Sequence, residues 1–306
     1  MRTYQVHIPC GVAGLLLCGV ALAALPTKQS NAGDSMSQGS GANGWPGDHV
    51  ELSWVQGTSS NVYSVYMRYR ELEPSFTQQP ESISGAEMVG GGNNFAAQAA
   101  RICAQEEKPQ HVSVLLGAND VCNRPRSSSP DATETLYSLD TWRNALRAGL
   151  DQLAACLPAG SKVHVLSFPR VDFLYNAGRA KGFWCSTIVW PTAGICRIVT
   201  AETQASRRAQ IGARINEYNE ATRAEVSLYD SNANGQNPRG VHFLSDWQGS
   251  IEEGHSNSSV GTYVFRAADI NGTDCFHPSV LGQRRLACAT WATNPDGAGV
   301  VSECFQ

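Results

Sequence analysis

The chain has 306 residues, of which 42% are hydrophobic and 16% are charged, and its formal net charge is -4 with a pI near 6.0. A chain of this length and hydrophobicity can bury a sizeable core, so disorder is excluded for most of it and one large domain is expected. Because the charge is slightly negative and the cations are scattered, nucleic acids and anionic membrane surfaces are poor partners. A small neutral substrate fits this composition.

The N-terminus has the pattern of a secretory leader. Arg2 is followed by an apolar stretch over 8–25, in which Ala21-Leu22-Ala23 offers small residues for a signal peptidase. We expect a signal peptide over 1–25, a mature domain over 26–306 and a secreted or periplasmic location. An uncleaved membrane anchor is the alternative, but glycines dilute the apolar run, so no stable anchor is predicted.

Cysteine usage agrees with export. Ten cysteines are present, and Cys10 and Cys18 lie in the leader, which leaves 10 − 2 = 8 in the mature domain. An even number in an exported protein indicates disulfide bonds, and the spacings do not resemble those of zinc sites. Eight cysteines allow about 105 connectivities. The pairs that we favour are Cys185 with Cys196, Cys103 with Cys122, and Cys275 with Cys304.

Helical and strand patterns alternate along the mature domain. Predicted helices cover 61–72, 95–106, 140–157 (capped by Asp140 or Thr141) and 202–225, with another from Ser279 to Trp291. Predicted strands cover 81–83, 111–116, 162–168 and 226–229. This alternation is typical of an α/β fold, a three-layer α/β/α sandwich with a central parallel sheet. Ligands of such sheets collect where strands give way to loops at their carboxyl ends.

The segment 172–198 departs from the alternation. It is rich in aromatic and aliphatic residues separated by glycines and a proline. One interpretation is an apolar wall or lid beside the active site, suited to an acyl chain. The alternative is a satellite hydrophobic cluster beneath a long loop.

Three residues far apart in the sequence supply the groups needed for nucleophilic catalysis. Ser35 lies soon after the leader, and Asp274 and His277 lie near the C-terminus. A serine hydroxyl is a weak nucleophile, so it needs a base such as His277, and a tight turn would let Asp274 orient the imidazole. We therefore predict Ser35, His277 and Asp274 as the catalytic residues.

An oxyanion hole is predicted from residues at two further loops. Asn119 follows the apolar strand 111–116, and Gly85 follows the predicted strand 81–83. The backbone N–H groups of Ser35 and Gly85, with the Asn119 amide, would stabilise the charge that develops on an ester oxygen. Taken singly, Asn119 and Gly85 are equally consistent with ordinary turn residues.

Together these motifs resemble those of the SGNH, or GDSL-type, hydrolase family. The four blocks are Gly33-Asp34-Ser35-Met36, Ile83-Ser84-Gly85, Gly117-Ala118-Asn119-Asp120 and Asp274-Cys275-Phe276-His277. A looser resemblance links the third and fourth blocks to the phospholipase B-like and lipase branches. The resemblance implies a flavodoxin-like sandwich and the same roles for Ser35, Gly85, Asn119, Asp274 and His277. Two departures are Met36 in place of leucine and a first strand, 27–31, that is too polar for the centre of a parallel sheet.

The function predicted from these residues is an exported serine ester hydrolase that acts through an acyl-enzyme and needs no metal or organic cofactor. The expected substrate is a lipid or a simple acyl ester. An O-acetyl ester of a glycan is the alternative within the same fold. A binding module without catalytic activity is the alternative if the protein is not an enzyme.

Overall fold

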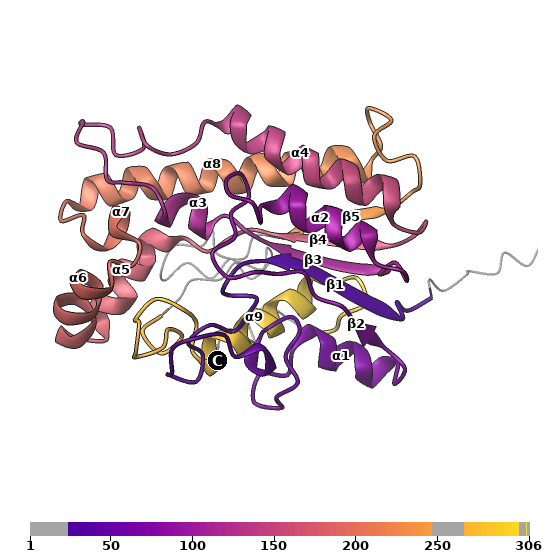
Figure 1. Ribbon diagram of the computed structural model, residues 1–306, viewed down its shortest axis with the longest axis horizontal. Coiled ribbons are helices and arrows are strands. Elements are labelled where there is room, and N and C mark those ends of the chain that lie inside the picture. Colours follow the sequence, from indigo (N-terminus) through magenta and orange to yellow (C-terminus); the bar gives the residue numbers. More distant parts are fainter. Residues whose placement is uncertain (1–23, 247–265, 300–303, 305–306) are drawn as a thin grey trace, which may run out of the picture.

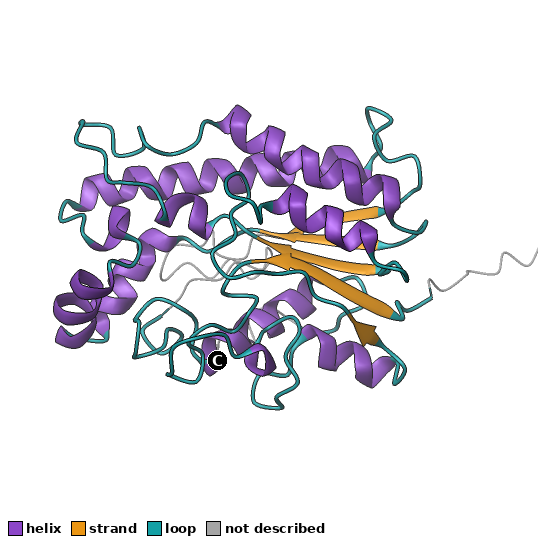
Figure 2. Ribbon diagram, viewed as in Figure 1, coloured by secondary structure: helices purple, strands orange, loops and turns teal. Residues whose placement is uncertain are grey.

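A computed structural model describes residues 24–246, 266–299 and 304. Its centre is a five-stranded, all-parallel sheet with the order β2-β1-β3-β4-β5 (Figure 2). The strands are β1 (Lys28–Gly33), β2 (Thr77–Gln78), β3 (His111–Leu115), β4 (Lys162–Leu166) and β5 (His242–Asp246). The predicted parallel α/β sandwich is confirmed. The predicted signal peptide lies almost wholly outside the described residues and stays a prediction.

Helices cover both faces of this sheet. One face carries α2, α4 and α8, and the other carries α1 and α9 (Figure 1). The bounds of these five are α1 (Val65–Leu72), α2 (Phe95–Ala104), α4 (Leu139–Cys156), α8 (Ala205–Asp230) and α9 (Val280–Thr293). The helix predicted from Ser279 to Trp291 is α9, and Ser279 is its N-cap, because its side chain accepts the Gly282 N–H. No described helix is long and apolar enough to cross a membrane.

Shorter helices gather near the carboxyl ends of the strands. The first, α3 (Ala118–Cys122), follows β3 directly. The segment that departs from the alternation forms α5 (Val171–Ala180), a π-helix (Trp184–Val189), α6 (Trp190–Ala193) and α7 (Arg197–Thr200). We call residues 171–200 the helical insertion. Figure 1 shows it at one end of the molecule, beyond the sheet.

The polar first strand is fully buried, contrary to the expectation that its polarity would keep it from the sheet centre. All six residues of β1 (28–33) are buried between β2 and β3. Several of their polar groups bond to neighbouring loops: Gln29 Nε2 donates to Val55 O (3.0 Å) and Ser30 Oγ to Gln79 O (2.6 Å), whereas Gln29 Oε1 and Asn31 Oδ1 have no partner among the described residues. Buried polar groups are tolerated when they are hydrogen-bonded. The strand therefore tolerates polarity because adjacent loops supply partners.

Residues 81–83 do not form the predicted strand. The strand beside β1 is β2, and residues 81–83 continue along its line with hydrogen bonds in one direction: Ile83 N–H still donates to Gly33 O (3.1 Å). The Gly33 N–H donates instead to Gln98 Oε1 (2.7 Å). Because the Gln98 side chain takes the Gly33 N–H, the regular strand pairing of β1 with this neighbouring segment ends before residues 81–83.

The predicted strand 226–229 is wrong, because α8 continues through it to Asp230. Buried residues keep helical spacing along the whole of α8, at Ile211, Ile215, Tyr218, Thr222, Val226 and Tyr229. The fifth strand is β5, which the sequence analysis missed, and which pairs with β4.

The predicted cap of α4, Asp140 or Thr141, is also wrong. The cap is Ser138, the residue before the first helical position, and its side chain accepts the Thr141 N–H (3.2 Å).

All eight mature-domain cysteines are paired, but not in the predicted pairs. The disulfides join Cys103 to Cys156, Cys122 to Cys196, Cys185 to Cys275, and Cys288 to Cys304. The predictions of Cys185 with Cys196, Cys103 with Cys122 and Cys275 with Cys304 are therefore wrong. They favoured near neighbours in sequence, whereas three of the bridges join elements brought together only by the fold, with separations of 53, 74 and 90 residues.

Candidate active site

The predicted catalytic residues meet at the carboxyl ends of the strands. Ser35 follows the end of β1, and Asp274 and His277 lie in the turn before α9. His277 Nε2 lies 2.7 Å from Ser35 Oγ, and His277 Nδ1 lies 2.7 Å from Asp274 Oδ2. The histidine thus bridges hydroxyl and carboxylate in the arrangement that general-base activation of serine requires.

The turn that carries His277 is built around the carboxylate of Asp274. Its Oδ1 accepts the backbone N–H groups of Phe276 (2.9 Å) and His277 (3.0 Å), which leaves Oδ2 for the imidazole. Burial acts to raise the pKa of Asp274, but the hydrogen bond from the His277 side chain and these backbone bonds outweigh it, so that the pKa is lowered. Asp274 is held as a carboxylate facing the imidazole.

Asn271 is a supporting residue that the sequence analysis missed. Its Nδ2 donates to Asp274 Oδ1 (2.8 Å) and to His277 O (3.1 Å), and its Oδ1 accepts the N–H of Asp274 (2.9 Å). Gly41 lies against this group, because a Cβ there would lie 2.7 Å from Asn271 Nδ2 and 3.0 Å from Asp274 Oδ2. The available signal was Asn271-Gly272, a dipeptide typical of turns, three residues before Asp274.

The predicted oxyanion residues line the same cavity as Ser35 and His277. Gly85 has φ +83°, a conformation that favours glycine. Asn119 lies in α3, and its Nδ2 donates to Ala86 O (2.9 Å), which leaves the second amide hydrogen for another acceptor. Among the described residues, the N–H groups of Ser35 and Gly85 have no acceptor. The site therefore combines unused N–H groups with a side-chain amide.

Asp120 explains how the Gly85 loop and α3 keep their relative positions. Its buried carboxylate accepts the backbone N–H groups of Met88 (2.6 Å) and Val89 (2.9 Å), which follow Gly85 closely in the chain. Burial raises the pKa of Asp120 to about 7, against the opposing effect of these two bonds. The sequence placed Asp120 beside Asn119 without assigning it this connecting role.

The segment before Ser35 is also fixed by buried polar contacts. Gln98 of α2 both donates to Gly33 O (3.1 Å) and accepts the Gly33 N–H. A side chain at Gly33 would collide with that of Ser37, so glycine is required there. Asp34 is buried and accepts the Met36 N–H (2.9 Å); burial raises the pKa of Asp34 to about 6. These contacts hold the turn that presents Ser35.

The cavity over Ser35 has a volume of about 490 Å³ and mainly small and polar walls. Trp45 is on its rim and is 72% exposed, which is unusual for so large an aromatic side chain. Of the helical insertion, only 194–196 line the cavity. The aromatic side chains of Phe183 and Trp184 are exposed to solvent and are not among its lining residues. The expected apolar wall is therefore narrower than the composition of 172–198 suggested.

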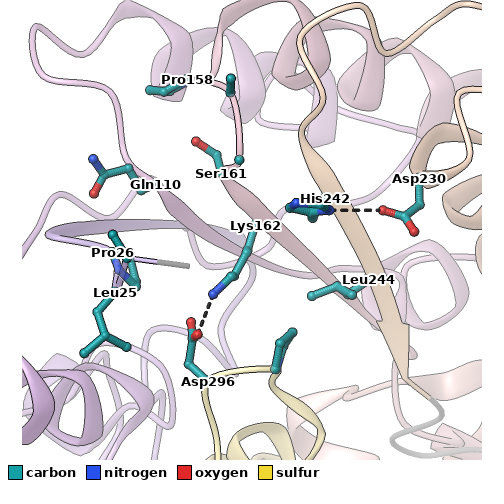
Figure 3. Close-up of a pocket in the computed structure, with 14 residues that line it drawn as sticks. Leu25, Pro26, Gln110, Pro158, Ser161, Lys162, Asp230, His242, Leu244 and Asp296 are labelled. Atoms are coloured by element: carbon teal, nitrogen blue, oxygen red, sulfur yellow. Dashed lines mark hydrogen bonds and ion pairs between the residues drawn. The ribbon is translucent and has the colours of Figure 1, made fainter. Parts of the chain in front are cut away.

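A larger cavity, of about 640 Å³, lies at the amino ends of β4 and β5 (Figure 3). Lys162 forms an ion pair with Asp296 there (2.5 Å), and His242 lies 3.9 Å from Asp230. Figure 3 shows Lys162 beside Asp296 and His242 beside Asp230. Across the described part of the chain, no cluster of three or more His, Cys, Asp or Glu side chains could hold a metal ion.

Comparison with known proteins identifies the family. The model of the GDSL-like lipase/acylhydrolase family matches residues 31–289, which include all four sequence blocks. The chain belongs to this family. The predicted family is thus confirmed, and this GDSL-family protein is an ester-bond hydrolase. No curated protein sequence matches the chain significantly.

Solved structures with a similar chain path include a variant of an acetyl-xylooligosaccharide esterase from Geobacillus stearmophilus. The two chains are 16% identical, the match covers 87% of this chain and 93% of the other, and the TM-score is 0.43. A protein from Lactobacillus plantarum has 16% identity, 88% and 96% coverage, and a TM-score of 0.46. A carbohydrate esterase has 12% identity, 86% and 66% coverage, and a TM-score of 0.39. These likenesses are too weak to say which ester this GDSL-family protein cleaves.

Proposed function

We propose that this GDSL-family protein is an exported serine esterase in which Ser35 is the nucleophile, His277 the general base and Asp274 the group that orients the imidazole. The observation that carries the proposal is the continuous hydrogen-bonded series from Ser35 Oγ through both ring nitrogens of His277 to Asp274 Oδ2, with both distances at 2.7 Å. The four disulfides are consistent with an oxidising compartment outside the cytosol.

The reaction then follows from this geometry. His277 Nε2 takes the Ser35 proton as Oγ attacks the ester carbon, and the carbonyl oxygen becomes an oxyanion within reach of the N–H groups of Ser35 and Gly85 and of Asn119 Nδ2. The protonated His277 gives its proton to the departing alcohol, which leaves an acyl group on Ser35. Water, deprotonated by His277, then releases the acid and restores the free hydroxyl.

The cavity favours a small acyl group over a long one. Most of its lining residues are small or polar, with Trp45, Pro46, Ile195 and Phe276 as the exceptions, and the exposed aromatics Phe183 and Trp184 do not line it. Long acyl chains need a continuous apolar channel to bury their methylene groups. We therefore propose short, simple acyl esters as the substrates, in preference to long-chain lipids.

Trp45 favours a second candidate within the same chemistry, an acetyl ester on a glycan. An exposed indole face at the cavity rim offers a flat apolar surface on which a sugar ring can stack. The loop holds Trp45 in place, because the backbone N–H of Trp45 donates to Asn43 Oδ1 (2.9 Å) and the backbone carbonyl oxygen of Trp45 lies 3.1 Å from His49 Nε2. The leaving alcohol would then be a sugar hydroxyl.

A panel of nitrophenyl esters from acetate to palmitate tests the proposed function. We expect kcat/KM to be highest for the shortest acyl groups and to be abolished by Ser35→Ala. Ser37→Ala is the matched control, because the Ser37 Oγ is buried with no hydrogen-bond partner among the described residues. Folded, disulfide-bonded protein without activity on any ester, or full activity in Ser35→Ala, would contradict the proposal.

The glycan candidate is tested with an acetylated oligosaccharide and Trp45→Ala. If the sugar stacks on Trp45, the variant raises KM for the oligosaccharide and leaves nitrophenyl acetate hydrolysis unchanged. Equal effects on both substrates, or none on either, would remove the stacking role.

A further inference from the structure

Cys275 lies in an unusual conformation inside the turn that carries the proposed base. It separates Asp274 from Phe276, is fully buried, and has φ +57°. A left-handed conformation is unfavourable for a residue with a β-carbon. In this turn, the left-handed conformation of Cys275 reverses the direction of the chain. The N–H groups of Phe276 and His277 can then both reach Asp274 Oδ1.

The helical insertion holds Cys275 at two atoms. Its Sγ is bonded to Cys185 of the π-helix, and its carbonyl oxygen accepts a hydrogen bond from Trp190 Nε1 (3.2 Å). The second contact comes from a different residue than the first, so the backbone and the side chain of Cys275 are anchored separately. These contacts oppose relaxation of the turn to an ordinary conformation.

Trp190 is itself tightly packed. It is buried, its ring stacks on Tyr175 of α5 with centroids 5.7 Å apart, and a side chain at Gly178 would collide with the indole. The turn of the proposed base is thus connected through Trp190 to α5. Figure 1 shows the segment before α9 close to the end of the molecule that holds α5 and α6.

A second disulfide fastens the same insertion to the opposite wall of the cavity. Cys122 is the last residue of α3, the helix that carries Asn119, and it is bonded to Cys196. Both cysteines line the cavity. The helical insertion is therefore bonded covalently to the oxyanion side and to the acid–base side of the site. This arrangement fits a fixed wall and not a lid that opens.

We propose that the Cys185–Cys275 disulfide and the Trp190 indole are positioning groups for catalysis: they hold Cys275 in its left-handed conformation and so keep Asp274 and His277 aligned with Ser35. This inference rests on the proposed function, since it assumes that His277 is the base. The bridge contributes more than global stability, because it constrains the residue between Asp274 and the two backbone N–H groups that Asp274 Oδ1 accepts.

The chain offers a matched control for this proposal. The Cys103–Cys156 bridge also joins elements distant in sequence, with a separation of 53 residues against 90. Entropic stabilisation by a disulfide rises only slowly with loop length, so removing either bridge should lower stability similarly. Cys103 and Cys156 lie at the ends of α2 and α4 and do not line the cavity. A difference in kcat between the two double variants therefore reports positioning.

The experiment measures kcat and KM for nitrophenyl acetate in Cys185→Ala/Cys275→Ala and in Cys103→Ala/Cys156→Ala. The assay temperature is well below the melting temperatures of both variants. We expect the first variant to lower kcat at least tenfold with KM changed less than about twofold, and the control to stay within about twofold of wild type in both. Cys185→Ala/Cys275→Gly should recover part of the lost kcat, because glycine adopts a positive φ without strain.

Trp190→Phe keeps every disulfide and removes the indole N–H together with part of the buried ring, so it tests this contact even if the double variant does not fold. Loss of one hydrogen bond should lower kcat about fivefold without changing KM. Wild-type kcat in Trp190→Phe would overturn the positioning role of the indole, and wild-type kcat in folded Cys185→Ala/Cys275→Ala would overturn that of the disulfide. If Ser35→Ala also kept its activity, the proposed function would fail; if Ser35→Ala were inactive, only the positioning inference would.

Discussion

The two ends of the parallel sheet both hold buried polar groups beside a cavity, yet they are organised differently. At the amino end, Lys162 and Asp296 neutralise one another. At the carboxyl end, His277 is hydrogen-bonded both to the carboxylate of Asp274 and to the hydroxyl of Ser35. Its Nε2 can therefore accept the serine proton. We propose that the smaller cavity is the reactive one. Connectivity between groups, and not cavity size or charge, distinguishes the two ends.

The ends also differ in what they leave unpaired. Around Ser35, the N–H groups of Ser35 and Gly85 have no acceptor within the described residues, and Asn119 keeps one amide hydrogen free. Unused donors directed at one cavity are costly unless a ligand or transition state accepts from them. The carboxyl end is thus prepared for an anionic oxygen, whereas the ion pair at the amino end is already complete.

The largest expected effect separates the histidines of the two ends. We predict that His277→Ala lowers kcat at least about 10⁴-fold, because His277 is the only base among the described residues that is hydrogen-bonded to Ser35 Oγ. His242→Ala, at the amino-end cavity, is the control and should leave kcat within about twofold. Steady-state kinetics on nitrophenyl acetate measure both. Comparable losses in the two variants would erase the distinction between the ends.

The next effect concerns the free amide hydrogen of Asn119. Asn119→Ala should lower kcat about 10²- to 10³-fold with little change in KM, because its bond to the oxygen strengthens in the transition state. Asn123 lines the same cavity, but its amide donates to Glu87 Oε1 (2.8 Å). Asn123→Ala should therefore stay within a few-fold of wild type. A larger loss in Asn123→Ala than in Asn119→Ala would assign the oxyanion hole wrongly.

At the amino end, we expect a change in stability without a change in catalysis. Lys162→Met leaves Asp296 buried without its cation, and breaking such a pair costs about 3 kcal/mol of unfolding free energy. Urea denaturation measures this cost, and kcat/KM on nitrophenyl acetate should stay within about twofold at a temperature where the variant is folded. A tenfold fall in kcat/KM of folded protein would show that the two ends are coupled.

The smallest effect is a pH dependence centred on Asp34. Burial raises the pKa of Asp34 to about 6, above the value of about 4 expected in the unfolded chain, so the folded state binds the proton more tightly. Its contribution to stability is therefore present at low pH and is lost as pH rises from about 4 through about 6. Relative to Asp34→Asn, the wild type should lose about 2 kcal/mol over that range.

Thermal unfolding of the two proteins from pH 4 to pH 7 measures this difference. His111 acts in the opposite sense, since burial lowers its pKa to about 3, but it is common to both proteins and cancels in the comparison. Parallel stability curves for wild type and Asp34→Asn would show that Asp34 is not held protonated.

The fold could be predicted where one physical signal dominates. The apolar run of β3 and the helical spacing of α4 gave their elements to within a few residues. The pattern failed where tertiary contacts decide. β1 is buried although it is polar, because loops supply partners for several of its polar groups, and α8 continues through a segment whose short apolar run resembles a strand. The disulfides failed for the same reason, since sequence distance says little about which helix ends meet.

The candidate site was predictable because its chemistry needs particular residue types in a particular order. Ser35, Asp274 and His277 come together as expected, and Gly85 and Asn119 line the same cavity. The supporting residues were not predictable. Asn271, Trp190 and the bridged Cys275 act through contacts that exist only after folding, and no local pattern connects Trp190 to Cys275.

The most direct test of the account is covalent labelling of Ser35 with a fluorophosphonate, followed by intact-mass and peptide analysis. A nucleophile activated by His277 should take up one probe per chain, on Ser35 alone, and Ser35→Ala and His277→Ala should remain unlabelled while Ser37→Ala labels like wild type. Folded wild type that stays unlabelled, or a probe carried on another residue, would contradict the assignment of the carboxyl-end cavity as the reactive site.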